Sequence, residues 1–137
     1  MKTLVVTNSQ GALAVVGSVV EETEGNPVVG SASTAQQAFD AIRRLHPDVV
    51  IVDMQTPNAG AHDLLENIYA AAEKAAVIAV CDSDGNLLDV KAKHPLAVVL
   101  WAAISKKLPW ILQRIAERQD NHAQRAASSF AFHSMSA

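Results

Sequence analysis

The sequence predicts an α/β fold in which a five-stranded parallel sheet is covered by helices on both faces. Short runs of β-branched residues alternate with longer stretches whose apolar residues recur at helical spacing. Strand runs such as 49–52 are continuously apolar, which is typical of parallel strands buried on both sides. Alanine and valine dominate the apolar residues and aromatic residues make up 4%, which suits a close-packed layered core. We therefore expect a three-layer α/β/α sandwich with five helices.

Strands and helices are expected to alternate through the first half of the chain. Residues 4–6 predict a buried strand, and Asn8 or Ser9 is a suitable cap for a helix that ends near Glu22. Residues 28–29 predict the second strand. Ser33 or Thr34 is expected to cap the next helix, which Pro47 ends because the residue before proline disfavours helical backbone.

The same alternation continues in the second half of the chain. The predicted strands here are 49–52, 77–80 and 97–100. Helices are predicted from about residue 63 and, more weakly, over 86–93. We expect Leu108-Pro109 to open the last helix, because proline is tolerated in a first helical turn.

Length, charge and cysteine content limit the class of protein. The 137 residues suit one domain, which we expect over 1–120, with 121–137 either extending the last helix or forming a flexible tail. A net charge of −3 argues against direct nucleic-acid binding. The single Cys81 cannot form an internal disulfide, and no apolar run reaches the roughly 20 residues of a membrane span. These features predict a cytoplasmic protein without membrane contact.

Polar and reactive side chains gather where the predicted strands end. In an open parallel sheet, ligands bind beyond the carboxyl ends of the strands. Asp53 is notable because it directly follows a fully apolar strand. The residues expected at this edge are Thr7, Asn8, Asp53, Cys81, Asp82, Asp84 and Trp101.

Around Asp53 the sequence resembles a known family. Residues 47–57 read Pro-Asp-Val-Val-Ile-Val-Asp-Met-Gln-Thr-Pro, and Gly60 and Leu64-Leu65 follow. This stretch resembles the centre of the receiver domain of two-component response regulators, and the resemblance extends over about residues 3–118. It implies a CheY-like, flavodoxin-like fold, a role in phosphorelay signal transduction, and Asp53 as the position of the phosphoacceptor.

The resemblance fails at the residues that surround Asp53. Receiver domains hold a divalent metal with an acidic pair after the first strand, where this chain has Thr7 and Asn8. The family's hydroxyl residue after the fourth strand corresponds to Cys81, and its lysine after the fifth strand corresponds to Trp101. Because phosphoryl transfer depends on positioning and charge neutralisation, these losses predict a pseudo-receiver. We expect it to need no cofactor.

The resemblance also implies how such a domain acts. In the family, the face formed by helix 4, strand 5 and helix 5 carries the output, so we expect a protein partner there. The amphipathic last helix, from Pro109 to about Ala126, could support a homodimer. The sequence offers no nucleophile with a matched base, so an enzyme is the weakest hypothesis.

Two alternatives stay open. The chain could be a working phosphoacceptor with a rearranged Mg²⁺ site that uses Asp53 with Asp82 or Asp84. It could also be a flavodoxin-like cofactor-binding protein whose loop 7–11 cradles a phosphate, although no G-x-G-x-x-G pattern is present.

Single residues also have simpler interpretations. Asp53 could be a strand-end carboxylate that accepts loop hydrogen bonds, Cys81 a small buried hydrophobe, and Trp101 either packing over the pocket or a binding surface.

Overall fold

Five parallel strands form the sheet that the sequence predicts. The computed structural model describes residues 1–23, 26–54, 67–68, 70–71, 74–82 and 97–136, and the side chains among them up to Asp120. The strand order is β2-β1-β3-β4-β5, with every neighbouring pair parallel. The strands are β1 (Thr3–Val6), β2 (Val28–Ala32), β3 (Val49–Asp53), β4 (Ala76–Cys81) and β5 (Ala97–Leu100).

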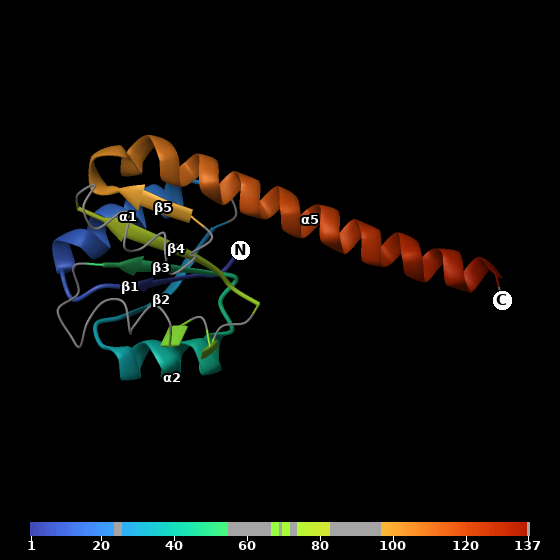
Figure 1. Ribbon diagram of the computed structural model, residues 1–137, viewed down its shortest axis with the longest axis horizontal. Coiled ribbons are helices and arrows are strands. Elements are labelled where there is room, and N and C mark those ends of the chain that lie inside the picture. Colours follow the sequence, from blue (N-terminus) through green and yellow to red (C-terminus); the bar gives the residue numbers. More distant parts are fainter. Residues whose placement is uncertain (24–25, 55–66, 69, 72–73, 83–96, 137) are drawn as a thin grey trace.

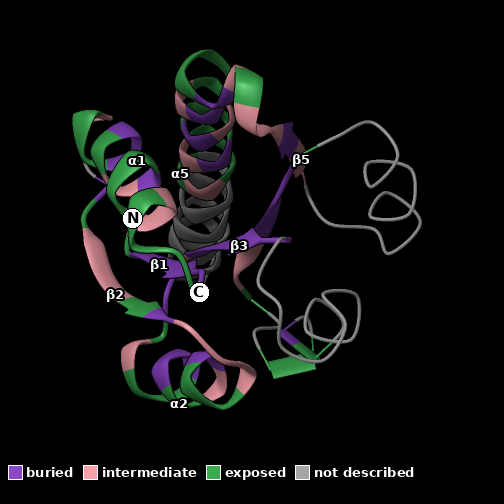
Figure 2. Cartoon of the chain, turned by 90° about the vertical axis from the view of Figure 1, so that its left-hand side faces the viewer, coloured by how far each residue is buried: buried purple, intermediate pink, exposed green. Residues whose placement is uncertain are grey.

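Helices cover both faces of this sheet (Figure 1). Helix α1 (Gln10–Glu22) and the long α5 (Ile104–Ser136) lie on one face, and α2 (Ala35–Leu45) lies on the other (Figure 2). Ser9 caps α1 by accepting a hydrogen bond from the N–H of Ala12, and Thr34 caps α2 in the same way. The fold class is therefore confirmed. The predicted helices at 63–72 and 86–93 lie outside the described residues, apart from short helical pieces at 67–68 and 70–71.

The prediction that Leu108-Pro109 opens the last helix is wrong. A short 3₁₀ turn, η1 (Trp101–Ala103), leads directly into α5, so that Pro109 lies inside the helix. Burial explains the earlier start, because Ile104 is 4% exposed and Leu108 is fully buried. Packing of this extra turn outweighs the backbone hydrogen bond that proline removes. From there, α5 continues well beyond the sheet as one helix (Figure 1).

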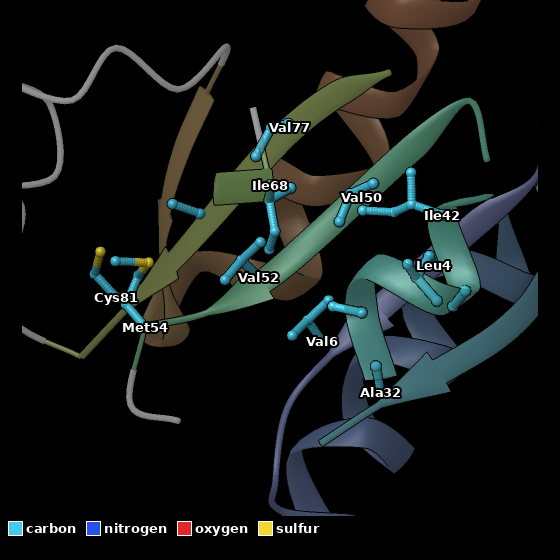
Figure 3. Packing of buried hydrophobic residues seen from close by; sticks show 13 residues of the cluster. Leu4, Val6, Ala32, Ile42, Val50, Val52, Met54, Ile68, Val77 and Cys81 are labelled. Atoms are coloured by element: carbon cyan, nitrogen blue, oxygen red, sulfur yellow. The ribbon is translucent and has the colours of Figure 1, made fainter. Parts of the chain in front are cut away.

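The core is divided by the sheet into two layers, because successive side chains of a strand point to opposite faces. Val50 and Val52 of β3 pack toward α2 (Figure 3), whereas Val49 and Ile51 pack toward α1 and α5. The α2 layer also contains Leu4, Val6, Ile42, Val77, Ala79 and Cys81. The α1–α5 layer contains Val5, Val16, Val20, Ile78, Val80, Ile104, Leu108 and Leu112.

Candidate functional site

Asp53 ends β3 and is buried, with 5% of its surface exposed. The alternation along β3 directs its side chain to the α1–α5 face of the sheet. A carboxylate in this position loses water on folding and needs hydrogen bonds from the protein in compensation. The residues next to Asp53 at the carboxyl edge of the sheet must therefore supply these hydrogen bonds, and they determine whether the carboxylate can bind a metal or accept a phosphoryl group.

Thr7 is the neighbour that contacts Asp53 directly. The register of β1 and β3 pairs Val6 with Val52, which brings the next residues of the two strands side by side. Thr7 Oγ1 donates a hydrogen bond to Asp53 Oδ2 at 2.7 Å, and both residues are buried. The same Oγ1 accepts a hydrogen bond from the N–H of Ser9 at 3.1 Å. The hydroxyl is thus fixed with its proton directed at the Asp53 carboxyl oxygen.

These donors fit a resident Mg²⁺ poorly. Mg²⁺ is held mainly through carboxylates in an octahedral shell. At the end of β1 the chain supplies a threonine hydroxyl, already committed to Asp53, and the amide of the exposed Asn8. Within the described residues, no cluster of three or more His, Cys, Asp or Glu side chains could hold a metal ion.

Cys81 ends β4 and is fully buried. Its side chain belongs to the α2 layer, where Met54 also lies (Figure 3). Burial raises the pKa of the Cys81 thiol above its ordinary value, and the nearby carboxylates of Asp53 and Asp82 raise it further. The thiol is therefore neutral at physiological pH, which confirms the interpretation of Cys81 as a small buried hydrophobe.

Trp101 begins η1, directly after β5. Its side chain is partly buried and packs against the α1–α5 layer of the core. The indole thus occupies the position where the family resemblance expects a lysine, and it brings no positive charge to this edge. Asp82 follows β4 and is exposed, whereas Asp84 lies outside the described residues.

The sequence identified Thr7 as a missing metal ligand but not as a hydrogen-bond donor. The sequence does contain a pattern that indicates this contact. Thr7 directly follows β1 and Asp53 ends β3, so the two side chains lie next to each other once Val6 pairs with Val52. The sequence alone did not establish that register. The structure brings Thr7 and Asp53 into contact, and it places Cys81 close enough for both Asp53 and Asp82 to affect its pKa.

A five-stranded parallel sheet in this order is the doubly wound α/β fold shared by flavodoxin and CheY, and an aspartate ends its central strand. The response regulator receiver domain matches residues 3–108, so the chain belongs to the receiver-domain family. The receiver topology expected from the resemblance is confirmed.

Solved receiver structures share this fold. The response regulator domain of Thermotoga maritima CheB superposes with a TM-score of 0.69 at 21% identity, covering 85% of this chain and 94% of that one. The isolated REC domain of RcsB from Salmonella enterica, solved with the phosphomimetic BeF₃⁻, gives a TM-score of 0.76 at 18% identity, covering 85% and 88%. At these identities the likeness supports the fold alone.

Curated relatives match only part of this chain. A protein-glutamate methylesterase/protein-glutamine glutaminase from Rhizobium etli is 37% identical over 67 residues, which cover 49% of this chain and 19% of the relative. The protein of the same description from Treponema pallidum is 32% identical over 63 residues, covering 46% and 16%. The match thus spans less than a fifth of either relative's length.

None of the helices in the described part of the chain could cross a membrane.

Proposed function

We propose that this receiver domain is a cytoplasmic pseudo-receiver, which signals by binding protein partners without phosphorylation of Asp53. The observation that carries the proposal is the 2.7 Å hydrogen bond from Thr7 to Asp53. Thr7 supplies a hydroxyl donor at a position where the family has a metal-binding carboxylate. The carboxylate of Asp53, at the phosphoacceptor position, is therefore already hydrogen-bonded within the protein.

The chemistry around Asp53 supports the same proposal. Transfer of a phosphoryl group to a carboxylate requires positive charge close to the transferring oxygens. Among the described residues that the sequence places at this edge, the Thr7 hydroxyl, the neutral Cys81 thiol and the Trp101 indole supply no positive charge. The domain therefore has no catalytic activity of its own in this proposal, and it uses neither a cofactor nor nucleic acid.

In this proposal the surface for partners is the face formed by β5 and α5. The predicted helix over 86–93, which the family resemblance adds to this face, lies outside the described residues. Trp110 on α5 is 57% exposed, so its indole is accessible to a partner. Arg114 lies over its ring at 5.0 Å from the centroid. Tryptophan and arginine are the residues most enriched at the energetic centres of protein interfaces.

Exposure to a small phosphodonor tests the proposal. The protein is incubated with acetyl phosphate and Mg²⁺, and its intact mass is measured beside an Asp53→Asn control and a receiver domain that is known to be phosphorylated. We expect the mass of the protein to stay unchanged while the known receiver gains one phosphoryl group. Stoichiometric modification that is absent from Asp53→Asn would refute the pseudo-receiver.

A second candidate function is a phosphoacceptor with a rearranged cation site between Asp53 and Asp82. One observation favours it: both carboxylates lie near enough to Cys81 to raise the pKa of its thiol. This candidate predicts that modification occurs, that EDTA prevents it, and that Asp82→Asn prevents it as well. The pseudo-receiver predicts no modification under any of these conditions.

A further inference from the structure

A cleft lies at the amino ends of β3 and β4, at the edge of the sheet opposite Asp53. Its volume is about 530 Å³, within the roughly 300–1,000 Å³ that is typical of small-molecule sites. One wall comes from the last turn of α2 and the turn into β3, and the other from residues 70–71 and 74–75 before β4. The proposed function uses the carboxyl edge and the β5–α5 face, so it gives this cleft no role.

The turn from α2 into β3 is held in place by hydrogen bonds within the protein. His46 has left-handed backbone with φ of 47°, and its N–H donates to the carbonyl of Ile42 at 3.0 Å. The N–H of Asp48 donates to the carbonyl of Lys2, and Asp48 Oδ2 accepts a hydrogen bond from the N–H of Lys2 at 2.8 Å. This wall of the cleft is thus formed before a ligand arrives, which lowers the free-energy cost of binding.

Much of the lining is apolar, whereas its charged and N–H-bearing groups are mainly basic. Arg43 and His46 come from the end of α2, and Lys74 comes from the opposite wall. All three side chains are exposed. The acid in the lining, Asp48, already accepts a hydrogen bond through one oxygen. The apolar residues of the lining are Ile42, Pro47, Ala70, Ala71 and Ala75.

Basic side chains at the end of a helix often bind the last carbonyls of that helix. Here Lys2 does so, because its Nζ donates to the carbonyl of Leu45 at 2.8 Å. Within the part of the chain that the structure describes, no hydrogen bond or ion pair joins the side chain of Arg43, His46 or Lys74 to another residue. The donors of these three side chains are therefore available to a ligand in the cleft.

We propose that this cleft binds a small phosphate monoester. The phosphate contacts Arg43, His46 and Lys74, and the organic group of the ester lies against the apolar lining. A phosphate group presents three strong acceptor oxygens, which match donors that approach from both walls. The guanidinium of Arg43 can bind two of these oxygens at once. The inference does not depend on the proposed function, because the cleft and Asp53 lie at opposite edges of the sheet.

Titration of the full chain with phenyl phosphate, followed by amide NMR spectra in Mg²⁺-free Tris buffer, tests the site. We expect saturable shifts at the amides of residues 42–48 and 74–76, with a dissociation constant of about 1 mM or below. Inorganic phosphate lacks the apolar group, benzoate carries a carboxylate instead, and phenol carries no charge. Each of these should bind at least about 5-fold more weakly than phenyl phosphate.

Substitution of the basic residues tests their contacts with the phosphate. Arg43→Gln and Lys74→Gln should each raise the dissociation constant by at least about 5-fold, since each removes a charged donor. Arg44→Gln is the matched control, because Arg44 is the next residue on α2, is exposed and lies outside the lining. It removes the same charge and should change the constant by less than about 2-fold. All three side chains are exposed, so the core stays intact, and the dispersion of the amide spectrum verifies the fold.

Any of four outcomes would overturn the inference. These are no saturable shift up to about 10 mM phenyl phosphate, shifts at Thr7 and Asp53 in place of the cleft, equal losses in Arg43→Gln and Arg44→Gln, or benzoate or phenol binding as tightly as phenyl phosphate. Equal losses would show general attraction of an anion to a basic surface. Asp53→Asn should bind phenyl phosphate as the wild type does, so this test and the phosphodonor test can fail independently.

Discussion

Removing the hydroxyl of Thr7 should destabilise the fold, because it takes a hydrogen bond from a buried carboxylate. In Thr7→Val the side chain keeps its shape, but Asp53 Oδ2 loses a donor at 2.7 Å. Both residues are 5% exposed, so water replaces the hydroxyl poorly. A hydrogen bond to a charged group contributes about 1.5–3 kcal/mol. We expect a loss of roughly 2 kcal/mol in unfolding free energy, or about 4–10 °C in melting temperature for a domain of this size.

Urea unfolding measured by far-UV circular dichroism gives this free energy for the wild type and the variant. A double-mutant cycle with Asp53→Asn then isolates the interaction between the two side chains. We expect a coupling energy of about 1 kcal/mol or more, because a neutral amide gains less than a carboxylate from a hydroxyl donor.

Thr3, at the start of β1, provides a matched control for Thr7, which directly follows β1. Thr3 is fully buried, and its Oγ1 has no hydrogen-bond partner in the part of the chain that the structure describes. Thr3→Val is the same chemical change without loss of a hydrogen bond, so it should be neutral or stabilising. If Thr7→Val costs no more than Thr3→Val, the Thr7–Asp53 hydrogen bond does not stabilise the fold, and the main observation behind the pseudo-receiver proposal loses its support.

Two further predictions concern stability. The raised pKa of the Cys81 thiol means that the folded chain keeps this proton at a pH where the unfolded chain loses it. Unfolding free energy should therefore fall as pH rises above about 8.5, by at most about 1.4 kcal/mol per pH unit, and Cys81→Ala should lack this part of the slope in urea titrations. Leu108→Ala should cost about 2–5 kcal/mol because Leu108 is fully buried, whereas Trp110→Ala, two residues further along the same helix, should cost much less because that side chain is exposed. Equal losses in thermal melts would contradict the assignment of Trp110 to the surface.

The sheet could be predicted from the sequence because its strands are continuously apolar. Runs such as 49–52 have one stable environment, the centre of a parallel sheet with both faces covered. The caps at Ser9 and Thr34 were also predictable, since each hydroxyl reaches an N–H three residues later. Local chemistry determines these features, and little long-range information is needed.

The start of α5 and the partner of Asp53 could not be predicted in the same way. Pro109 is a good residue for a first helical turn, but burial of Ile104 and Leu108 moves the start of the helix toward β5. The Thr7–Asp53 contact depends on the register between strands 46 residues apart. Such features are set by tertiary packing, which a local pattern does not contain.

The proposed function has a consequence for how this domain could be regulated. A switch needs two conformations whose free energies differ by only a few kcal/mol, and a signal that binds one of them better. The hydroxyl on Asp53 and the buried neutral thiol of Cys81 both favour a single state of the carboxyl edge. A signal would then act through the concentration of the binding partner, because occupancy of the β5–α5 face follows mass action. Partner binding should accordingly be the same for Asp53→Asn and wild type with a phosphodonor present. A difference between them would show that the edge still switches.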